Sequence, residues 1–175
     1  CGGLAVDDVI LVTTSEDELN ADGDCSLREA IQAANTDTAV DACKAGGPVD
    51  VISLGVQGAT FTITLSGAGE DQNQTGDFDL TGAVAIHGCG AEVSTVDGGA
   101  LDRVFHVHPG ASVELHDLTV SGGRVVGGAG QIPQGGVGDG FGGGLYNAGD
   151  ASVQGCTFAE NVAQGGAGSE GGHAP

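Results

Sequence analysis

The sequence of 175 residues has few aromatic and few basic side chains. Aromatic residues make up 3% of it and glycine occupies 35 positions, so a folded core must be built from thin layers of Val, Ile, Leu and Ala. Four Lys and Arg residues stand against 24 Asp and Glu residues, which gives a net charge of −20 at pH 7. This excess of negative charge argues against nucleic acid as a partner, because it repels phosphate backbones. It favours divalent cations, or it serves solubility alone.

Several sequence motifs of catalytic, phosphate-binding and metal sites are also absent. The sequence has no Gly-x-Ser-x-Gly nucleophile motif, and the glycines at 142–144 are not followed by the Lys and helix of a phosphate-binding loop. No C-x-x-C pair occurs among the five cysteines, which argues against a zinc ribbon or a thioredoxin-like centre. No signal peptide and no membrane-spanning run is visible, so we expect a soluble segment.

Two of the cysteines flank the segment that reads as a helix. A disulfide between Cys25 and Cys43 would tie both ends of that segment to one strand layer, and it would contribute roughly 3 kcal/mol in the chain-entropy model. This predicted disulfide indicates an oxidising, exported location. Cys89 and Cys156 lie in strand-like runs and are expected to be buried thiols. Cys1 is open to three interpretations: a lipid-modified N-terminus, which is the one route to a membrane, a partner for another cysteine, or a cloning boundary.

The segment Cys25–Asn35 is the one stretch that reads plainly as a helix. Ser26 and Glu29 have the spacing of a capping box, and Asn35 is a plausible stop. The apolar residues between them fall on one face at helical spacing: Leu27, Ala30, Ile31 and Ala34. A lone helix beside many strands must bury such a face on those strands. We therefore expect it to cap one end of a stack of strands.

The rest of the chain reads as short strands separated by glycine turns. The segment Phe61–Leu65 alternates most cleanly and is predicted to be a half-buried strand. From Phe78 onward, units of three short strands recur. These units are Phe78–Leu80, Val84–Ile86 and Val93–Val96; then Phe105–Val107, Val113–Leu115 and Leu118–Val120; then Leu145–Asn147, Ala151–Val153 and Cys156–Phe158. Three parallel strands per unit describe a right-handed parallel β-helix, which is a solenoid.

The predicted domain organisation follows from these units. The capped β-helix domain spans residues 1–163 and contains a Gly-rich loop insertion at 122–144. Residues 164–175 are similar in composition and are expected to form a flexible Gly-rich tail. No second cap follows the last unit, so its strand edges are expected to be exposed unless a partner covers them.

The helix segment Cys25–Ile31, followed by Ala33-Ala34-Asn35, resembles the CSLREA motif. That motif marks the N-terminal region of many exported bacterial proteins with a right-handed parallel β-helix. Four downstream segments are also similar to the repeats of that family: Gly69–Asp71, Asp97–Gly99, Arg103–Val107 and Gly142–Gly149. The resemblance covers almost the whole chain. It implies the fold and export, and it implies no established catalytic activity.

The acidic loop before the helix has the spacing of a calcium-binding EF-hand loop. Counting from Glu18 as position 1, the oxygen-bearing residues Asn20, Asp22, Asp24 and Glu29 fall at positions 3, 5, 7 and 12. These five residues are the predicted calcium ligands. The alternative is an acidic turn that favours the N-terminal end of the helix, since no helix precedes the loop and Glu29 already belongs to the capping box.

A second group of carboxylates consists of Glu70, Asp71, Asp77 and Asp79. These carboxylates could hold calcium, or two of them could act as the acid and base of a glycoside hydrolase. A hydrolase would also need aromatic platforms for sugars, whereas only Phe78 is adjacent and the alternation points it inward. A solvated acidic loop is the simpler interpretation.

The histidines fall into two pairs. Aligning Val84–Ile86 with Val113–Leu115 puts His87 and His116 at the same place in successive turns, about 4.8 Å apart and facing outward. His106 and His108 share one face of their strand. Imidazole pairs could hold a transition metal, but a metal site needs three or four converging ligands. Stacking on the surface is therefore the favoured interpretation.

The sequence thus predicts a mainly β protein, a right-handed parallel β-helix with a short N-terminal capping helix, secreted or displayed at the bacterial surface. The favoured function is non-enzymatic: a structural, adhesive or assembly module that meets a second copy, another surface protein or a glycan. Calcium is the one cofactor considered. The alternative is a fragment of a carbohydrate-active β-helix enzyme, a polysaccharide lyase or glycoside hydrolase, with its carboxylates among Asp71, Asp77 and Asp79.

Overall fold

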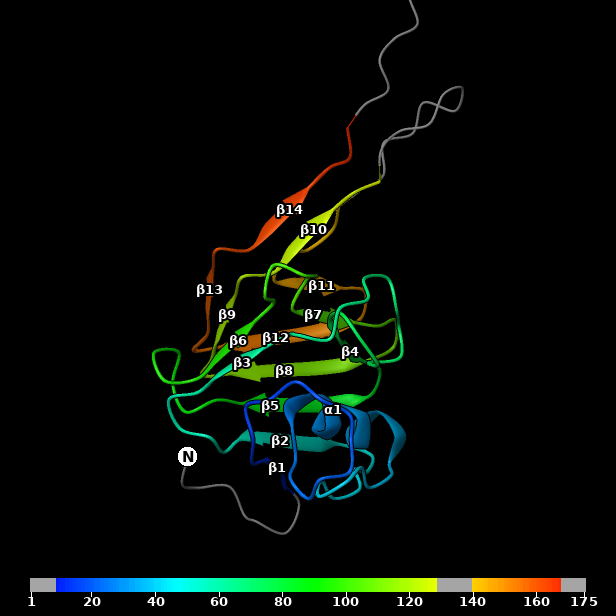
Figure 1. Cartoon of the computed structure of the whole chain (residues 1–175), viewed down its shortest axis with the longest axis vertical. Helices are drawn as coiled ribbons and strands as arrows, with labels where there is room; N and C mark the ends of the chain where they lie inside the picture. The colour runs from blue at the N-terminus through cyan, green and yellow to red at the C-terminus, as the bar shows by residue number, and fades with distance from the viewer. Residues whose placement is uncertain (1–8, 129–139, 168–175) are drawn as a thin grey trace, which may run out of the picture.

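A computed structural model describes residues 9–128 and 140–167. Cys1, part of the Gly-rich segment and the end of the tail lie outside these residues, and so do the expectations for them. The described part is mainly β, with parallel sheets and a single short helix, α1 (Leu27–Thr36) (Figure 1). Within this part, no helix has the length and apolar character needed to cross a membrane.

Three parallel sheets make up most of the fold. The first sheet is ordered β1 (Val9–Val12), β2 (Asp50–Leu54), β5 (Ala83–His87), β8 (Ser112–His116) and β12 (Asp150–Gln154). The second is ordered β3 (Thr60–Thr62), β6 (Thr95–Asp97), β9 (Thr119–Ser121) and β13 (Thr157–Ala159). The third is ordered β4 (Phe78–Leu80), β7 (Phe105–Val107) and β11 (Leu145–Asn147).

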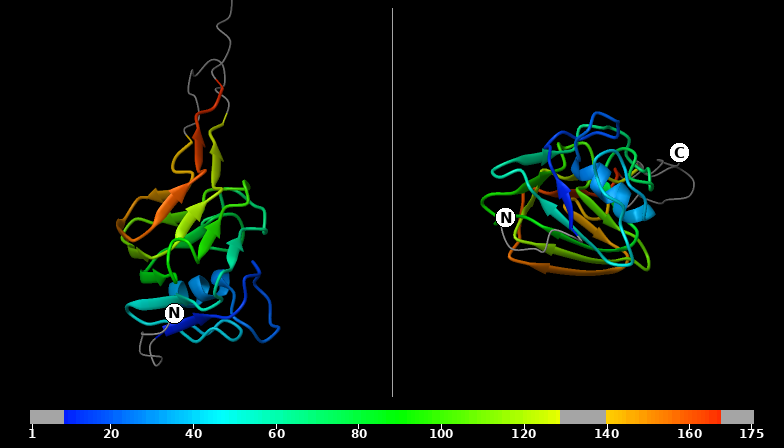
Figure 2. Two further views of the ribbon diagram at one scale, coloured as in Figure 1. Left: turned by 90° about the vertical axis from the view of Figure 1, so that its left-hand side faces the viewer. Right: turned by 90° about the horizontal axis from the view of Figure 1, so that it is seen from below.

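The chain visits these sheets in a fixed order. Strands β2, β3 and β4 belong to the first, second and third sheet in turn, and β5, β6 and β7 repeat that order. Each strand therefore lies beside the strand one unit earlier and runs parallel to it. The view along the long axis shows the strands of the three sheets around a common interior (Figure 2).

The strand register stacks apolar side chains above one another in the interior. Ile52, Ile86 and Leu115 are successive partners in the first sheet, and each is fully buried. In the third sheet Phe78 pairs with Phe105, and their ring centroids are 5.8 Å apart. The inward position predicted for Phe78 is confirmed. Burial of such aliphatic and aromatic side chains is the main stabilising contribution in a core of this kind.

Helix α1 closes one end of the stack. It contacts β1, β2 and β4. In the described part of the chain, β1 lengthens the first sheet at this end, and the second and third sheets have no strand that corresponds to it. The predicted capping box is present, because Ser26 Oγ accepts the Glu29 N–H and the Glu29 carboxylate accepts the Ser26 N–H. The helix ends at Thr36, one residue beyond the predicted stop, and Asp37 follows in the left-handed conformation.

The predicted disulfide is confirmed. Cys25 and Cys43 are bonded, with Cα atoms 4.9 Å apart, and both are buried. The expectation of a buried thiol was wrong for Cys89, which is disulfide-bonded. Cys156 is half-buried and is the free cysteine of the described ranges.

Two expectations about segments need correction. The Gly-rich segment 122–144 is not entirely loop, because β10 (Arg124–Val126) lies within it and pairs with β14 (Val162–Gln164). The strand predicted over Phe61–Leu65 ends at Thr62. The physical reason is that the N–H groups of Thr64 and Leu65 donate to a carboxylate oxygen of Asp17, at 2.7 and 2.9 Å, and so leave the sheet.

Candidate metal centres

The acidic loop brings three of its predicted ligands together. Glu18, Asp22 and Asp24 each offer a carboxylate oxygen within 4.8 Å of the others. The Asn20 side chain donates to Glu18 Oε2 at 2.6 Å. Loss of solvent, followed by repulsion from Asp22, raises the pKa of both Glu18 and Asp24. Such a group of carboxylates is more stable when a cation lies between them.

The fifth predicted ligand, Glu29, is used differently. Its Oε2 accepts the N–H of Ser26 and its Oε1 accepts the N–H of Asn20, both at 3.0 Å. The side chain is fully buried against the start of α1. Both oxygens of Glu29 thus already serve the helix N-terminus and the loop. Glu18, Asp22 and Asp24 remain the carboxylates of the loop that face one another.

A second group, which we call the histidine–aspartate cluster, consists of Asp71, Asp79, His106 and His108. One ligand atom from each lies within 4.8 Å of the others. Oδ1 of Asp79 lies 2.7 Å from Nε2 of His108 and 3.3 Å from Nδ1 of His106. Oδ1 of Asp71 lies 3.6 Å from the same His106 nitrogen. The two imidazole centroids are 3.8 Å apart.

The strand register builds this cluster. Asp79 on β4 pairs with His106 on β7, which in turn pairs with Tyr146 on β11. These residues alternate with the inward-facing apolar side chains of their strands and therefore face outward. His108 lies two residues after His106 and so shares its face, as predicted. The segment 66–76 brings Asp71 to the cluster, and its Asn73 N–H donates to Asp79 Oδ2 at 2.9 Å.

The cluster is partly removed from solvent. The Asp79 side chain is fully buried, and those of His106 and His108 are 12% and 18% exposed. Asp71 is 69% exposed. Burial, and next the neighbouring His108, lowers the pKa of His106. This direction favours the neutral imidazole, which is the form that binds metals.

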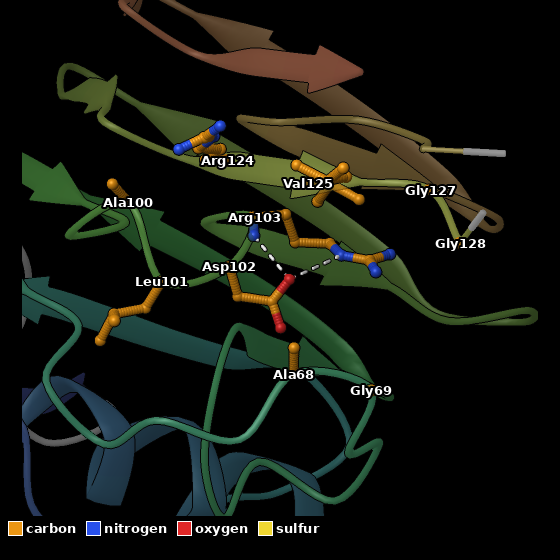
Figure 3. A pocket seen from close by; sticks show the side chains of 11 residues that line it. Ala68, Gly69, Ala100, Leu101, Asp102, Arg103, Arg124, Val125, Gly127 and Gly128 are labelled. Atoms are coloured by element: carbon orange, nitrogen blue, oxygen red, sulfur yellow. Dashed lines mark hydrogen bonds and ion pairs between the residues drawn. The ribbon is translucent and has the colours of Figure 1, made fainter. Parts of the chain in front are cut away.

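Asp77, the remaining carboxylate of the enzymatic alternative, lies beside Arg103. Arg103 Nε is 3.1 Å from Asp77 Oδ2. Burial, and next repulsion from Asp102, raises the pKa of Asp77 to about 8, against the opposing effect of Arg103. Arg103, Asp102 and Arg124 line a pocket of about 630 Å³ (Figure 3). Asp77 and Asp79 are not among its lining residues.

The other histidine pair stacks as predicted. His87 and His116 are register partners on β5 and β8, and their rings lie 4.5 Å apart at an angle of 7°. His116 Nε2 is 3.0 Å from Glu114 Oε2. Within the described part of the chain, this pair belongs to no group of three or more converging ligands.

The chain was compared with known proteins, and no family model, no curated protein and no solved structure matches it. The sequence analysis treated the second carboxylate group and the His106–His108 pair as separate candidates. It did not predict that Asp71 and Asp79 lie beside these histidines. The signal was present, because aligning Phe78–Leu80 with Phe105–Val107 places Asp79 beside His106. The approach of Asp71 depends on a loop and had no such signal.

Proposed function

We propose that this chain is a right-handed parallel β-helix of the CSLREA-motif type that is exported to the bacterial surface, where it serves as a structural assembly module. Three parallel sheets visited in a fixed order support this fold, since parallel crossovers are almost always right-handed. The Cys25–Cys43 disulfide supports export through an oxidising compartment.

One observation carries the assembly role: among the described residues, no further strand pairs with β12 or β13 at the end of the stack opposite α1. Val153 on β12 and Phe158 on β13 continue the interior stacks of Leu115 and Val120 in register. They are 43% and 44% exposed, whereas Leu115 and Val120 are fully buried. Strands β12 and β13 are also the outer strands of their sheets, and such edges pair readily with further strands.

A second copy of the chain is the occupant that this end favours. Helix α1 covers the opposite end, so a head-to-tail stack cannot continue from copy to copy. Two copies that meet through their open ends bury both apolar layers and form a closed pair with twofold symmetry. The net charge of −20 opposes this contact, so the association should strengthen as salt screens the repulsion.

Light scattering coupled to size-exclusion chromatography tests this assignment. We expect the mass to rise from one chain toward two with concentration, and Phe158→Asp to abolish the rise, because a charge cannot be buried unpaired in an apolar contact. The matched control is Leu11→Asp, which adds the same charge at an exposed apolar position on β1. A monomer at every concentration and salt, or a dimer that Phe158→Asp leaves intact, would contradict the proposal.

We infer further that Glu18, Asp22 and Asp24, with the amide oxygen of Asn20, bind calcium and stabilise the loop before α1. The convergence of the three carboxylates supports this inference. Calcium in 100-fold excess over its dissociation constant should raise the free energy of unfolding by about 2.7 kcal/mol. Thermal unfolding with calcium and with chelator at matched ionic strength measures the effect.

The Asp22→Asn/Asp24→Asn variant should lose this response to calcium. The control is Asp37→Asn/Asp150→Asn, which removes two exposed carboxylates outside the loop and should respond like the wild type. If the loop variant still responds fully, or the wild type does not respond, the calcium assignment is wrong.

The carbohydrate-active alternative is favoured by a different observation. Arg103 and Arg124 line one pocket in an otherwise acidic protein, and Arg103 contacts Asp77, whose pKa is about 8. Arginine pairs bind carboxylates, so an acidic polysaccharide is the fitting substrate class. Release of unsaturated products or reducing ends from a panel of such polysaccharides would favour a lyase or a hydrolase, and no release would favour the structural module.

A further inference from the structure

We propose that the histidine–aspartate cluster binds one divalent first-row transition metal ion, with Asp79, His106 and His108 as its main ligands and Asp71 as the fourth. This site is independent of the structural role proposed above. It also differs in chemistry from the acidic loop, which offers oxygen atoms alone. Imidazole nitrogen combined with carboxylate oxygen suits zinc, copper, nickel or iron, whereas calcium takes oxygen ligands.

The spacing of the ligand atoms fits such an ion. Zinc binds nitrogen and oxygen at about 2.0–2.1 Å in a tetrahedron, which places neighbouring ligand atoms about 3.3 Å apart. The distances from His106 Nδ1 to Asp79 Oδ1 and to Asp71 Oδ1 are 3.3 and 3.6 Å. Asp79 and His108 lie closer, at 2.7 Å, because they form a hydrogen bond. A rotation of the His108 side chain that lengthens this contact by about 0.6 Å would bring it to the spacing of a tetrahedral ion.

Strand pairing and a buried hydrogen bond hold Asp79, the central ligand, in place. Asp79 lies on β4 and is paired in register with His106 on β7. Its second carboxylate oxygen accepts the Asn73 N–H at 2.9 Å, and Asn73 is itself fully buried, with its side-chain amide donating to the Arg28 carbonyl. Hydrogen bonds of this kind orient ligating carboxylates and are a regular part of metal sites.

The charge of the ligands and their exposure to solvent also favour a bound metal ion. The two carboxylates balance the charge of a divalent ion, and the ion in turn compensates the buried Asp79 carboxylate. The partly exposed His106 and His108 leave a route for the ion from solvent. The Asp71 side chain is 69% exposed and offers its carboxylate to the ion from the solvent side.

Calorimetric titration with Zn²⁺ tests the site. The experiment uses chelator-treated, dialysed protein that carries Cys156→Ser, since Cys156 is a free thiol, and it is run in excess Ca²⁺. We expect one Zn²⁺ per chain and a loss of affinity of about 100-fold or more in His106→Gln/His108→Gln, because removing ligands costs at least as much as removing their supporting partners. The matched control is His87→Gln/His116→Gln, the other pair of neighbouring histidines, which should bind like the parent.

A spectroscopic readout accompanies the titration. Co²⁺ bound in place of Zn²⁺ should give the intense visible absorption of a four-coordinate ion, and His106→Gln/His108→Gln should abolish it. Circular dichroism of both variants without metal checks that the fold is retained. Absence of one-to-one binding, equal losses in the two histidine variants, or a Co²⁺ spectrum like that of the hydrated ion would overturn the proposal. Affinity unchanged in Asp71→Asn would overturn the assignment of the fourth ligand.

Discussion

Replacing Arg28 with methionine should lower the free energy of unfolding by about 3–5 kcal/mol, because it leaves the buried Asp17 carboxylate without its charged partner. Arg28 is fully buried in α1, and its Nε donates to Asp17 Oδ1 at 2.6 Å, with an Asp17 side chain that is 2% exposed. Its Nη2 donates to the Gly76 carbonyl at 2.8 Å. The guanidinium also lies over the Phe78 ring, 4.7 Å from its centroid. The substitution thus removes contacts that join the helix to Asp17 and to the segment 76–78.

Urea unfolding followed by circular dichroism measures this loss. Arg124→Met is the matched control, because Arg124 is exposed and its loss should change stability by less than about 0.5 kcal/mol. Arg28→Lys should fall between the two, since a lysine keeps the charge but not the planar set of donors. If Arg28→Met is as stable as Arg124→Met, the buried ion pair does not fasten the helix.

Sequence patterns within single elements were sufficient to predict the capping box of the helix and the short parallel strands. The capping box needs only Ser26 and Glu29, three residues apart, and the structure forms it as expected. Short apolar runs between glycines predicted parallel strands in the correct units, and aligning these units paired His87 with His116. Such predictions succeed because each depends on residues within one element or on a repeating register.

Contacts between segments far apart in the sequence could not be predicted in this way. The burial of Arg28 depends on Asp17, which lies 11 residues before it, and on carbonyl groups of the segment 73–77, which lies more than 40 residues after it. The strand after Phe61 ends early for the same reason, since the Asp17 carboxylate accepts the backbone N–H groups that would continue it. Asp71 likewise reaches the histidines through the folding of a loop. In each case the deciding partner is set by tertiary structure.

The Cys25→Ala/Cys43→Ala variant should lose about 3 kcal/mol of stability, because the disulfide closes a loop with a sequence separation of 18 and restricts the unfolded chain. Both cysteines are buried beside α1, so small cavities should add to the loss. Urea unfolding of the oxidised protein and of the variant measures the difference. The control is Cys156→Ala, which removes a half-buried free thiol and should cost under about 1 kcal/mol.

The denaturant dependence separates the two sources of this loss. If the disulfide acts through the unfolded chain, the variant unfolds to a less compact state that exposes more surface, so the slope of stability against urea concentration should rise. If it acts through packing in the folded state, the slope should stay as in the wild type while the midpoint falls. A midpoint equal to that of Cys156→Ala would contradict both, and the helix would then be held by its other contacts without help from the disulfide. A loss near 3 kcal/mol would instead be a large share of the 5–15 kcal/mol that stabilises a typical domain. The position of helix α1 at the end of the stack would then depend on an oxidising environment, because the Cys25–Cys43 disulfide forms only there.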